Sequence, residues 1–288
     1  MLTNKEILDL LDKSYKNRLT LLNILKRCGD AHIGGASSAM DILTVLYNKI
    51  LKHDSDNPKW EDRDIFILSA GHKAVALYVV LQSAGYFEED ILWTYNALNT
   101  RVPMHPDEKL LPGIEFPTGS LGHGLSVASG IANAYKMDNR KNKIYVLLGD
   151  GEAAEGAVWE AALGAAKYKL DNLTIVIDVN GLQSENYTRD ILPVAPFEPK
   201  YLSFGWSVRT IDGHDIAQIY KALSEAPYEV KKPTCIIANT VKGKGIDFAE
   251  GSPEYHHWAP SSDEQADFAI ECMKKCYKLE VEKIGKNR

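Results

Sequence analysis

The stretch from Lys143 to Leu182 reads KIYVLLGDGEAAEGAVWEAALGAAKYKLDNLTIVIDVNGL and decides the fold. It contains two short apolar runs, 143–148 and 173–179, separated by an alanine-rich segment over 153–168. Short apolar runs bounded by glycine and polar residues are typical of buried strands, and the longer segment between them is typical of a helix. We therefore predict a strand–helix–strand unit. Its right-handed crossover brings the carboxyl ends of both strands to the same edge of a parallel sheet.

The rest of the chain continues this alternation. Small-residue and proline-rich segments over 29–38 and 99–120 are expected to be loops. Apolar strands that alternate with helices are typical of a parallel sheet covered on both faces. The predicted fold class is α/β, with one domain over 1–288 and a helical tail from about residue 262. The remaining predicted strands are 64–69, 207–211 and 234–238, and the remaining predicted helices are 4–27, 41–51, 75–84, 88–98, 121–137 and 216–226.

The composition limits the class of protein. The chain has 288 residues, of which 45% are hydrophobic and 25% charged, with a net charge of −6. This hydrophobic content excludes a disordered chain, and the negative charge disfavours a protein that wraps nucleic acid. No apolar run reaches the roughly 18 residues that span a bilayer, and the first residues do not resemble a secretory signal. We expect a cytoplasmic protein with reduced cysteines that binds neither membranes nor nucleic acid.

Polar residues follow both strands of the central unit. Gly149-Asp150-Gly151 comes directly after the first strand, and Asn180-Gly181 comes directly after the second. The shared sheet edge brings Asp150 and Asn180 close together, at the place where open α/β sheets bind ligands. A carboxylate and an amide oxygen suit Mg²⁺ or Ca²⁺, with a backbone carbonyl after Asn180 as a third ligand. The glycines and the start of the helix near Ala153 suit a phosphate, so we predict a metal-bridged diphosphate site.

Histidines in loops are a second signal. A group of them at one sheet edge would suit proton transfer to sugar hydroxyls and carbonyls. The sequence contains no zinc-hydrolase spacing, no P-loop and no dinucleotide fingerprint after a strand. The loop histidines are His32, His72, His105, His123 and His256.

At this point the sequence resembles the transketolase family, in particular its N-terminal, thiamine diphosphate-binding half. The central stretch resembles the thiamine diphosphate motif of the family, and four other segments resemble further family segments in the same order. These are DAHIGGASSAMDIL (30–43), RDIFILSAGHKAVALY (63–78), VPMHPDEKLLPGIEFPTGSLGHG (102–124) and KGKGIDFAEGSPEYHHWAP (242–260).

The resemblance implies three groups of site residues. The Mg²⁺ ligands, which could also hold Ca²⁺ or Mn²⁺, would be Asp150, Asn180 and the carbonyl oxygen of Leu182. The cofactor-binding residues would be His72, Gly119, Ser120, Leu121, Gly151, Asp150, Asn180 and Lys242. The catalytic group would be His32, His105, His256 and Glu155, of which the histidines face the donor sugar and Glu155 lies near a subunit interface. Glu155 could instead be a first-turn glutamate that the helix dipole favours.

The resemblance also implies a partner. A full transketolase has a pyrimidine-binding domain and a C-terminal domain, for which this chain has no residues left. We therefore expect one subunit of a split transketolase in an α2β2 assembly. It would transfer a two-carbon ketol unit from a ketose, by default a sugar phosphate, to an aldose, with the cofactor as electron sink.

Four departures from the family pattern put the substrate in doubt. They are Ile33, Lys73, His123 and the loop 183–186. Lys73 could be a solvated surface residue, as most lysines are, or could add charge near the diphosphate. Two other functions stay open: the α subunit of a 2-oxo acid dehydrogenase, which uses the same cofactor, and a catalytically silent binding protein.

Overall fold

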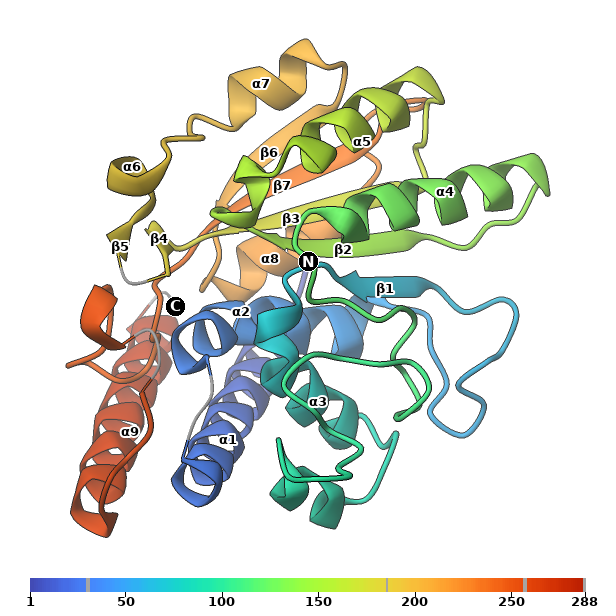
Figure 1. Ribbon diagram of the computed structural model, residues 1–288. Coiled ribbons are helices and arrows are strands. Elements are labelled where there is room, and N and C mark those ends of the chain that lie inside the picture. Colours follow the sequence, from blue (N-terminus) through green and yellow to red (C-terminus); the bar gives the residue numbers. More distant parts are fainter. Residues whose placement is uncertain (30–31, 185, 256–257, 287–288) are drawn as a thin grey trace.

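A five-stranded parallel sheet forms the centre of the molecule (Figure 1). The computed structural model describes residues 1–29, 32–184, 186–255 and 258–286. The strand order is β1-β2-β3-β7-β6, and every neighbouring pair is parallel. The carboxyl ends of the strands therefore share one edge. The strands are β1 (Ile65–Leu68), β2 (Ile144–Gly149), β3 (Leu173–Val179), β6 (Ser207–Asp212) and β7 (Thr234–Asn239).

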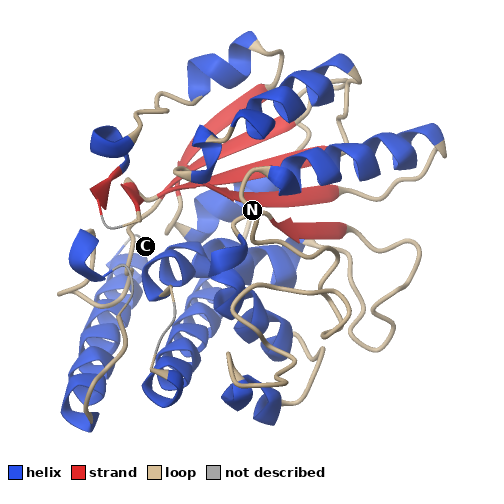
Figure 2. Cartoon of the chain, in the orientation of Figure 1, coloured by secondary structure: helices blue, strands red, loops and turns tan. Residues whose placement is uncertain are grey.

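Helices cover both faces of the sheet, as Figure 2 shows. The alternation of strand side chains divides the core into two halves. In β2, Tyr145 and Leu147 pack on one side, while Val146 and Leu148 pack on the other. Helices α4 (His123–Met137), α5 (Gly156–Lys167) and α7 (Glu198–Ser203) cover the second side. Helices α1 (Asn4–Cys28), α2 (Ile33–Val45), α3 (Ala74–Ser83) and α8 (Ile216–Ser224) cover the first.

The α/β class and the two-sided parallel sheet confirm the prediction, and the helical tail is α9 (Asp263–Lys286). This helix packs antiparallel to α1: the Tyr15 and Tyr277 rings stack with centroids 4.5 Å apart, and Lys26 pairs with Asp263 at 2.6 Å. The two helices form one layer under the sheet in Figure 1. The ends of the described chain are therefore close in space.

Three predicted element boundaries are wrong. The predicted loop 29–38 is largely helix, because α2 begins at Ile33 and every one of its residues is buried. Tertiary packing stabilises its run of small residues, which have no amphipathic pattern. The predicted helix 88–98 is only a 3₁₀ turn over Glu89–Thr94, and the predicted helix 153–168 divides into a 3₁₀ turn (Glu152–Ala154) and α5.

Short elements follow β3 that the sequence pattern did not predict. Strands β4 (Leu182–Gln183) and β5 (Asn186–Tyr187) pair antiparallel beside the carboxyl edge of the sheet. A one-turn helix, α6 (Thr188–Ile191), follows them. Gln183 and Asn186 of the predicted loop 183–186 are therefore strand residues, and Leu182, Gln183 and Ser184 form one wall of the site described next.

Candidate active site

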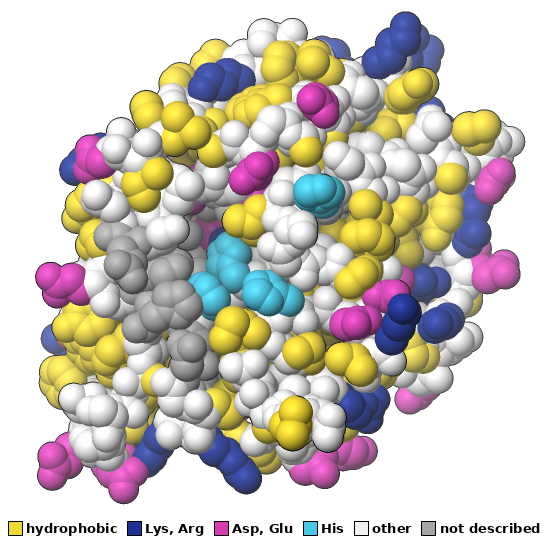
Figure 3. Space-filling model, in the orientation of Figure 1, with side chains coloured by type: hydrophobic (Ala, Val, Ile, Leu, Met, Phe, Trp, Pro, Cys, Tyr) yellow, Lys and Arg dark blue, Asp and Glu magenta, His cyan; other side chains and the backbone are white. Residues whose placement is uncertain are grey.

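A cavity of about 250 Å³ lies at the carboxyl edge of the sheet. The loops after β1, β2, β3 and β7 all contribute to its lining, together with the start of α2 and the loop before α4. Figure 3 shows histidine side chains gathered on this face of the molecule. The predicted site residues that line the cavity are His32, His72, His105, Gly119, Leu121, Asp150, Gly151, Asn180, Leu182 and Lys242.

Asp150 and Asn180 lie close together on the cavity floor, as the strand–helix–strand unit predicts. The Asp150 carboxylate accepts hydrogen bonds from the backbone N–H groups of Gly151 and Gly181 at 2.9 and 2.8 Å. Asn180 Oδ1 accepts one from the N–H of Leu182 at 3.1 Å. Burial, followed by the nearby charge of Asp178, raises the pKa of Asp150 to about 6. An acid in this environment gains from a neighbouring cation.

The donor set fits a metal-bridged diphosphate. Within the described residues, no group of three or more His, Cys, Asp or Glu side chains could hold a metal ion. A cation here would therefore depend on Asp150, the Asn180 amide, a backbone carbonyl and phosphate oxygens, which are ligands that Mg²⁺ accepts. Gln183 Oε1 is buried in the wall without a hydrogen-bond partner among the described residues, as expected of a ligand-facing group.

Three histidines line the cavity. His32 and His72 have ring centroids 5.4 Å apart, and His105 lies beside Gly119. A Cβ atom on Gly119, whose φ is +148°, would come within 3.1 Å of the His105 ring. This loop therefore needs glycine to approach the imidazole so closely.

Lys242 closes one side of the cavity. Its aliphatic part lies against Gly34 at the start of α2, where an added Cβ would come within 2.7 Å of Lys242 Cγ. Its ammonium donates a hydrogen bond to the carbonyl of Ser184 at 3.3 Å. Burial, followed by the charge of Lys73, lowers the pKa of Lys242 to about 8. An anionic ligand would stabilise its charged form.

Lys73 is not a surface residue, so the default expectation for a lysine is wrong here. Its side chain is 2% exposed, and its ammonium forms an ion pair with the fully buried Asp178. Burial alone would raise the pKa of Asp178, but Lys73 and hydrogen bonds from Ser38 and Thr240 hold it below its ordinary value. The Lys73 side chain thus lines the cavity with its charge paired to Asp178.

Sequence reasoning missed Glu152. This buried carboxylate accepts hydrogen bonds from the N–H groups of Gly122 and Gly149 at 2.9 and 3.0 Å, and from the Ser69 hydroxyl. It thereby ties the loop before α4 to the end of β2. A glutamate directly after Gly-Asp-Gly was a signal, but glutamate is so common at helix starts that the pattern did not mark it.

Three predicted site residues do not line the cavity. Ser120 and Glu155 are exposed. The Glu155 side chain lies against Gly122, where an added Cβ would come within 2.6 Å of Glu155 Cβ. Its predicted position near a subunit interface stays a prediction. His256 lies outside the described residues.

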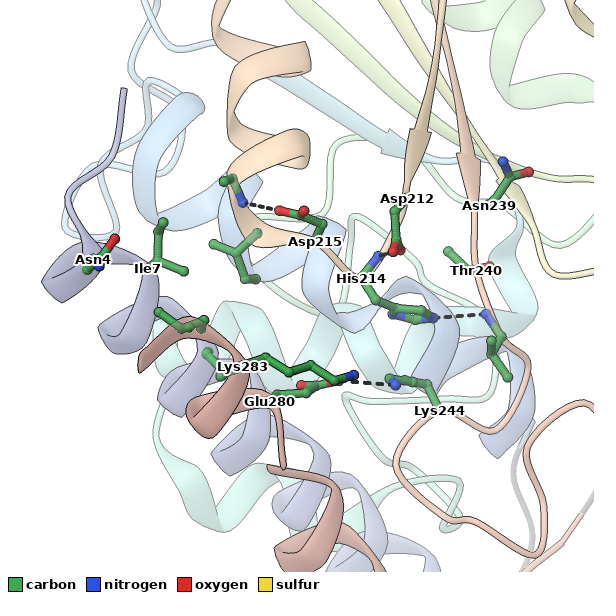
Figure 4. Close-up of a pocket in the computed structure, with 15 residues that line it drawn as sticks. Asn4, Ile7, Asp212, His214, Asp215, Asn239, Thr240, Lys244, Glu280 and Lys283 are labelled. Atoms are coloured by element: carbon green, nitrogen blue, oxygen red, sulfur yellow. Dashed lines mark hydrogen bonds and ion pairs between the residues drawn. The ribbon is translucent and has the colours of Figure 1, made fainter. Parts of the chain in front are cut away.

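A larger cavity, of about 770 Å³, lies between α1, α9 and the ends of β6 and β7 (Figure 4). His214 points into this region. Its Nε2 accepts a hydrogen bond from the N–H of Val241 at 2.9 Å, and its Nδ1 contacts Asp41 at 2.7 Å. The lining mixes acids, lysines and aliphatic side chains and includes none of the predicted site residues. The smaller cavity is therefore the candidate site.

The fold and the site together define an α/β domain whose sheet-edge cavity suits an anionic, diphosphate-type ligand. A family model described as the thiamine diphosphate-binding domain of transketolase matches residues 13–282. The chain is 45% identical over 262 residues to an apulose-4-phosphate transketolase subunit of Actinobacillus succinogenes, covering 91% of this chain and 94% of that protein. The chain therefore belongs to the transketolase family, and the predicted resemblance is confirmed.

Further comparisons agree. The chain is 41% identical over 254 residues to a 6-deoxy-6-sulfo-D-fructose transketolase subunit of Clostridium sp., covering 88% of this chain and 92% of that one. A solved transketolase from Campylobacter jejuni matches with a TM-score of 0.84 and 30% identity over 96% of this chain. One from Leishmania mexicana matches with a TM-score of 0.85 and 26% identity. The chain spans about half the length of these solved chains, 48% and 45%. Among the described residues, no helix is long and apolar enough to cross a membrane.

Proposed function

We propose that this chain is the diphosphate-binding subunit of a split transketolase that uses thiamine diphosphate and Mg²⁺. One observation carries the proposal: Asp150 and Asn180 share a cavity with His32, His72 and His105 at the carboxyl edge of a parallel sheet. Relatives that match over most of their length are named as transketolase subunits, which favours this function over that of a 2-oxo acid dehydrogenase.

The floor of the cavity would hold the cofactor. Asp150, Asn180 and the carbonyl of Leu182 would bind Mg²⁺, and His72, Gly151 and Lys242 would contact the diphosphate. Thiamine diphosphate, when bound, supplies the electron sink for cleavage of the C2–C3 bond of a ketose. Asp150 must be ionised to bind the cation, and Lys242 must be protonated to attract the phosphates.

The mouth of the cavity would hold the sugar. His32 and His105 would hydrogen-bond the C1 hydroxyl and C2 carbonyl of the donor and move a proton during cleavage and transfer. His105 is exposed in this chain. Because the reaction requires a site closed to water, another chain must cover the side of the cavity where His105 lies. We propose that a second subunit, with a pyrimidine-binding domain and a C-terminal domain, supplies the cover in an α2β2 assembly.

The donor is proposed to be a ketose with an anionic end group. Two relatives are named for a sugar phosphate and a sulfonated sugar, which share a ketose-type backbone and a terminal anion. The part of the site that binds the terminal anion would lie mostly on the second subunit. This chain would therefore determine the chemistry and not the choice of sugar.

The test is an activity assay with and without the partner. The purified chain is incubated with thiamine diphosphate, Mg²⁺, a panel of phosphorylated and sulfonated ketoses, and an aldose acceptor. We expect no turnover by either of the separate chains and ketol transfer when both are mixed, because the site is shared between them. Robust turnover by this chain alone would contradict the split assembly, and CO₂ release from pyruvate by the pair would contradict the transketolase reaction.

A further inference from the structure

The buried pair of Lys73 and Asp178 lies directly behind the cavity floor, and the function proposed above gives it no role. The two side chains are 2% and 0% exposed. Lys73 lines the cavity, while Asp178 is the penultimate residue of β3, two positions before Asn180. Placing two charges out of water is costly, and a hydrophobic pair of similar size often serves stability equally well. Stability alone therefore does not explain why a charged pair occupies this position beside the cavity.

Asp178 contacts the proposed cation ligand Asn180. One of its oxygens, Oδ2, accepts hydrogen bonds from the Ser38 hydroxyl at 2.6 Å, from the Lys73 ammonium, and from Asn180 Nδ2 at 3.5 Å. Asn180 Oδ1 is held by the N–H of Leu182. The Asn180 amide nitrogen therefore lies towards Asp178 and Ser38, at 3.5 Å from each, and the amide oxygen lies towards the N–H of Leu182. This orientation leaves the second lone pair of Oδ1 to face a cation.

The surrounding charges make Lys73 necessary. The cavity wall includes the carboxylates of Asp150 and Glu152, with Asp178 behind them and Lys242 as the other lysine. Without Lys73, the charge of Asp178 would be unpaired behind a floor that already holds the acids Asp150 and Glu152, with Lys242 as the remaining lysine of the lining. Repulsion between charges at such short range in a poorly solvated site is strong. Lys73 balances the charge of Asp178 and so makes the floor acceptable to an anion.

The local packing leaves room for this lysine. A Cβ on Gly35 of α2 would come within 3.3 Å of Lys73 Cε, and one on Gly149 would lie 3.9 Å from Lys73 Nζ. A side chain at position 35 would crowd the lysine stem, whereas the end of β2 at Gly149 lies at ordinary contact distance from its ammonium. Gly35 therefore leaves room for Lys73, whose ammonium lies between α2 and the end of β2.

We propose that Lys73 and Asp178 act as a positioning pair for the diphosphate site: Asp178 orients the amide of Asn180, and Lys73 balances the charge of Asp178 so that an anionic ligand binds beside Asp150. The inference rests on the proposed function, because it concerns how that site accepts thiamine diphosphate. Neither residue is a catalytic residue in this scheme.

The test measures thiamine diphosphate binding by calorimetry, at saturating Mg²⁺, in the complex with the partner subunit. The variants are Lys73→Met and the double variant Lys73→Met/Asp178→Asn. The control is Lys244→Met, which removes a lysine that is 17% exposed, is paired with Glu280 and does not line the candidate site. We expect the single variant to raise the Kd at least about tenfold, and the double variant to return it to within about threefold of wild type. The Asp178→Asn substitution keeps a side-chain oxygen for the Asn180 amide but removes the charge that needs a partner.

The outcomes separate the two proposals. If the wild-type complex does not bind thiamine diphosphate, the proposed function fails. If the wild-type complex binds the cofactor and the Lys73→Met complex binds it equally well, the pair has only a structural role and the inference is overturned. The same holds if the double variant loses at least as much affinity as Lys73→Met. If Lys73→Met does not fold, the double variant decides by its affinity alone. If neither folds, the pair is structural and the inference is likewise overturned. Lys244→Met should lose stability without a change in Kd.

Discussion

At the scale of single residues, Asp150 has the two properties expected of a cation ligand. Its carboxylate is oriented by two backbone N–H groups, and burial with the charge of Asp178 raises its pKa to about 6. Its ionised form is therefore less favourable in the protein than in water, although it still predominates at neutral pH. A bound divalent cation would stabilise the ionised carboxylate and offset the cost of its burial. The environment of Asp150 therefore favours cation binding.

Asp150→Ala and Asn180→Ala are expected to abolish Mg²⁺-dependent binding of thiamine diphosphate with little effect on the fold. Each removes an oxygen ligand at the sheet edge without opening the apolar core. Calorimetric titration of the complex with cofactor and Mg²⁺ measures the loss. A matched control is Asp64→Ala, since Asp64 also accepts two backbone hydrogen bonds, from Lys143 and Lys52, but lies away from the cavity. Unchanged affinity in both site variants would end the metal assignment.

His105→Ala should impair cleavage of the donor far more than binding of the cofactor. His105 lies at the mouth of the cavity, so its role is with the sugar and not with the diphosphate. Loss of a proton-transfer partner costs about 10²–10⁴ in rate. Single-turnover cleavage of a ketose measures the effect, with His123→Ala as a control because His123 is exposed and does not line the cavity. Normal cleavage by the His105 variant would contradict the role.

At the scale of elements, a buried polar network joins α1, α2 and the loop before α8. Arg18 of α1 forms two hydrogen bonds with the Asp41 carboxylate of α2, at 2.8 and 2.7 Å. His214, which Figure 4 shows beside Thr240, contacts the same carboxylate at 2.7 Å. Burial alone would raise the pKa of Asp41, but Arg18 and then His214 hold it well below its ordinary value. The network fixes the buried helix α2, and with it one wall of the site.

Asp41→Asn is expected to destabilise the protein by about 3–5 kcal/mol at neutral pH, because it leaves the Arg18 charge buried without a counter-charge. The pKa of Asp41 is lower in the folded chain, so its stabilising effect is complete above its unfolded pKa of about 3.9 and is lost as the pH falls further. The difference in unfolding free energy between wild type and variant should therefore be constant above about pH 5 and shrink below about pH 4.

Urea denaturation at several pH values measures this difference. The control is Glu225→Gln, which removes a carboxylate from a half-exposed pair with Arg209. Such pairs contribute at most about 1 kcal/mol, so this variant should show little effect at any pH. A difference for Asp41→Asn that stays constant down to about pH 2 would contradict the assigned ion pair.

Sequence patterns correctly predicted the elements whose own residues show a clear apolar pattern. The strands β2 and β3 are continuous apolar runs, and the glycines and polar residues after them mark the sheet edge. Helix α2 was missed because its small residues form a helix only when packing surrounds them. The buried roles of Lys73 and Glu152 depend on partners far away in the sequence, such as Asp178 and Gly122, which no local pattern reveals.

At the scale of the whole molecule, the described residues leave the site open on one side. The cavity lies at the surface of this chain, and solved transketolases of the same fold are about twice as long, with this chain covering 48% and 45% of two of them. A reaction that passes through a carbanion needs a site closed to water. We therefore expect a stable interface of about 2,000 Å² or more with the second subunit.

Cofactor and assembly should be linked. A ligand held between two chains binds the complex and not the separate subunits, so it must strengthen association by the same free energy. We expect thiamine diphosphate with Mg²⁺ to lower the dissociation constant of the two subunits at least about tenfold, and chelation of Mg²⁺ to reverse the effect. Sedimentation velocity measures both. Identical association with and without cofactor would place the site on one chain alone.

The antiparallel packing of α1 and α9 has a consequence for chain connectivity. Asn4 and Lys283 line the same cavity, so a short covalent bridge could join the start of α1 to the end of α9. The backbone could then be opened elsewhere, for instance in the surface loop 54–59 that precedes β1. Such a circular permutant would keep both terminal helices in place, because the stacking of Tyr15 on Tyr277 does not depend on which element is synthesised first.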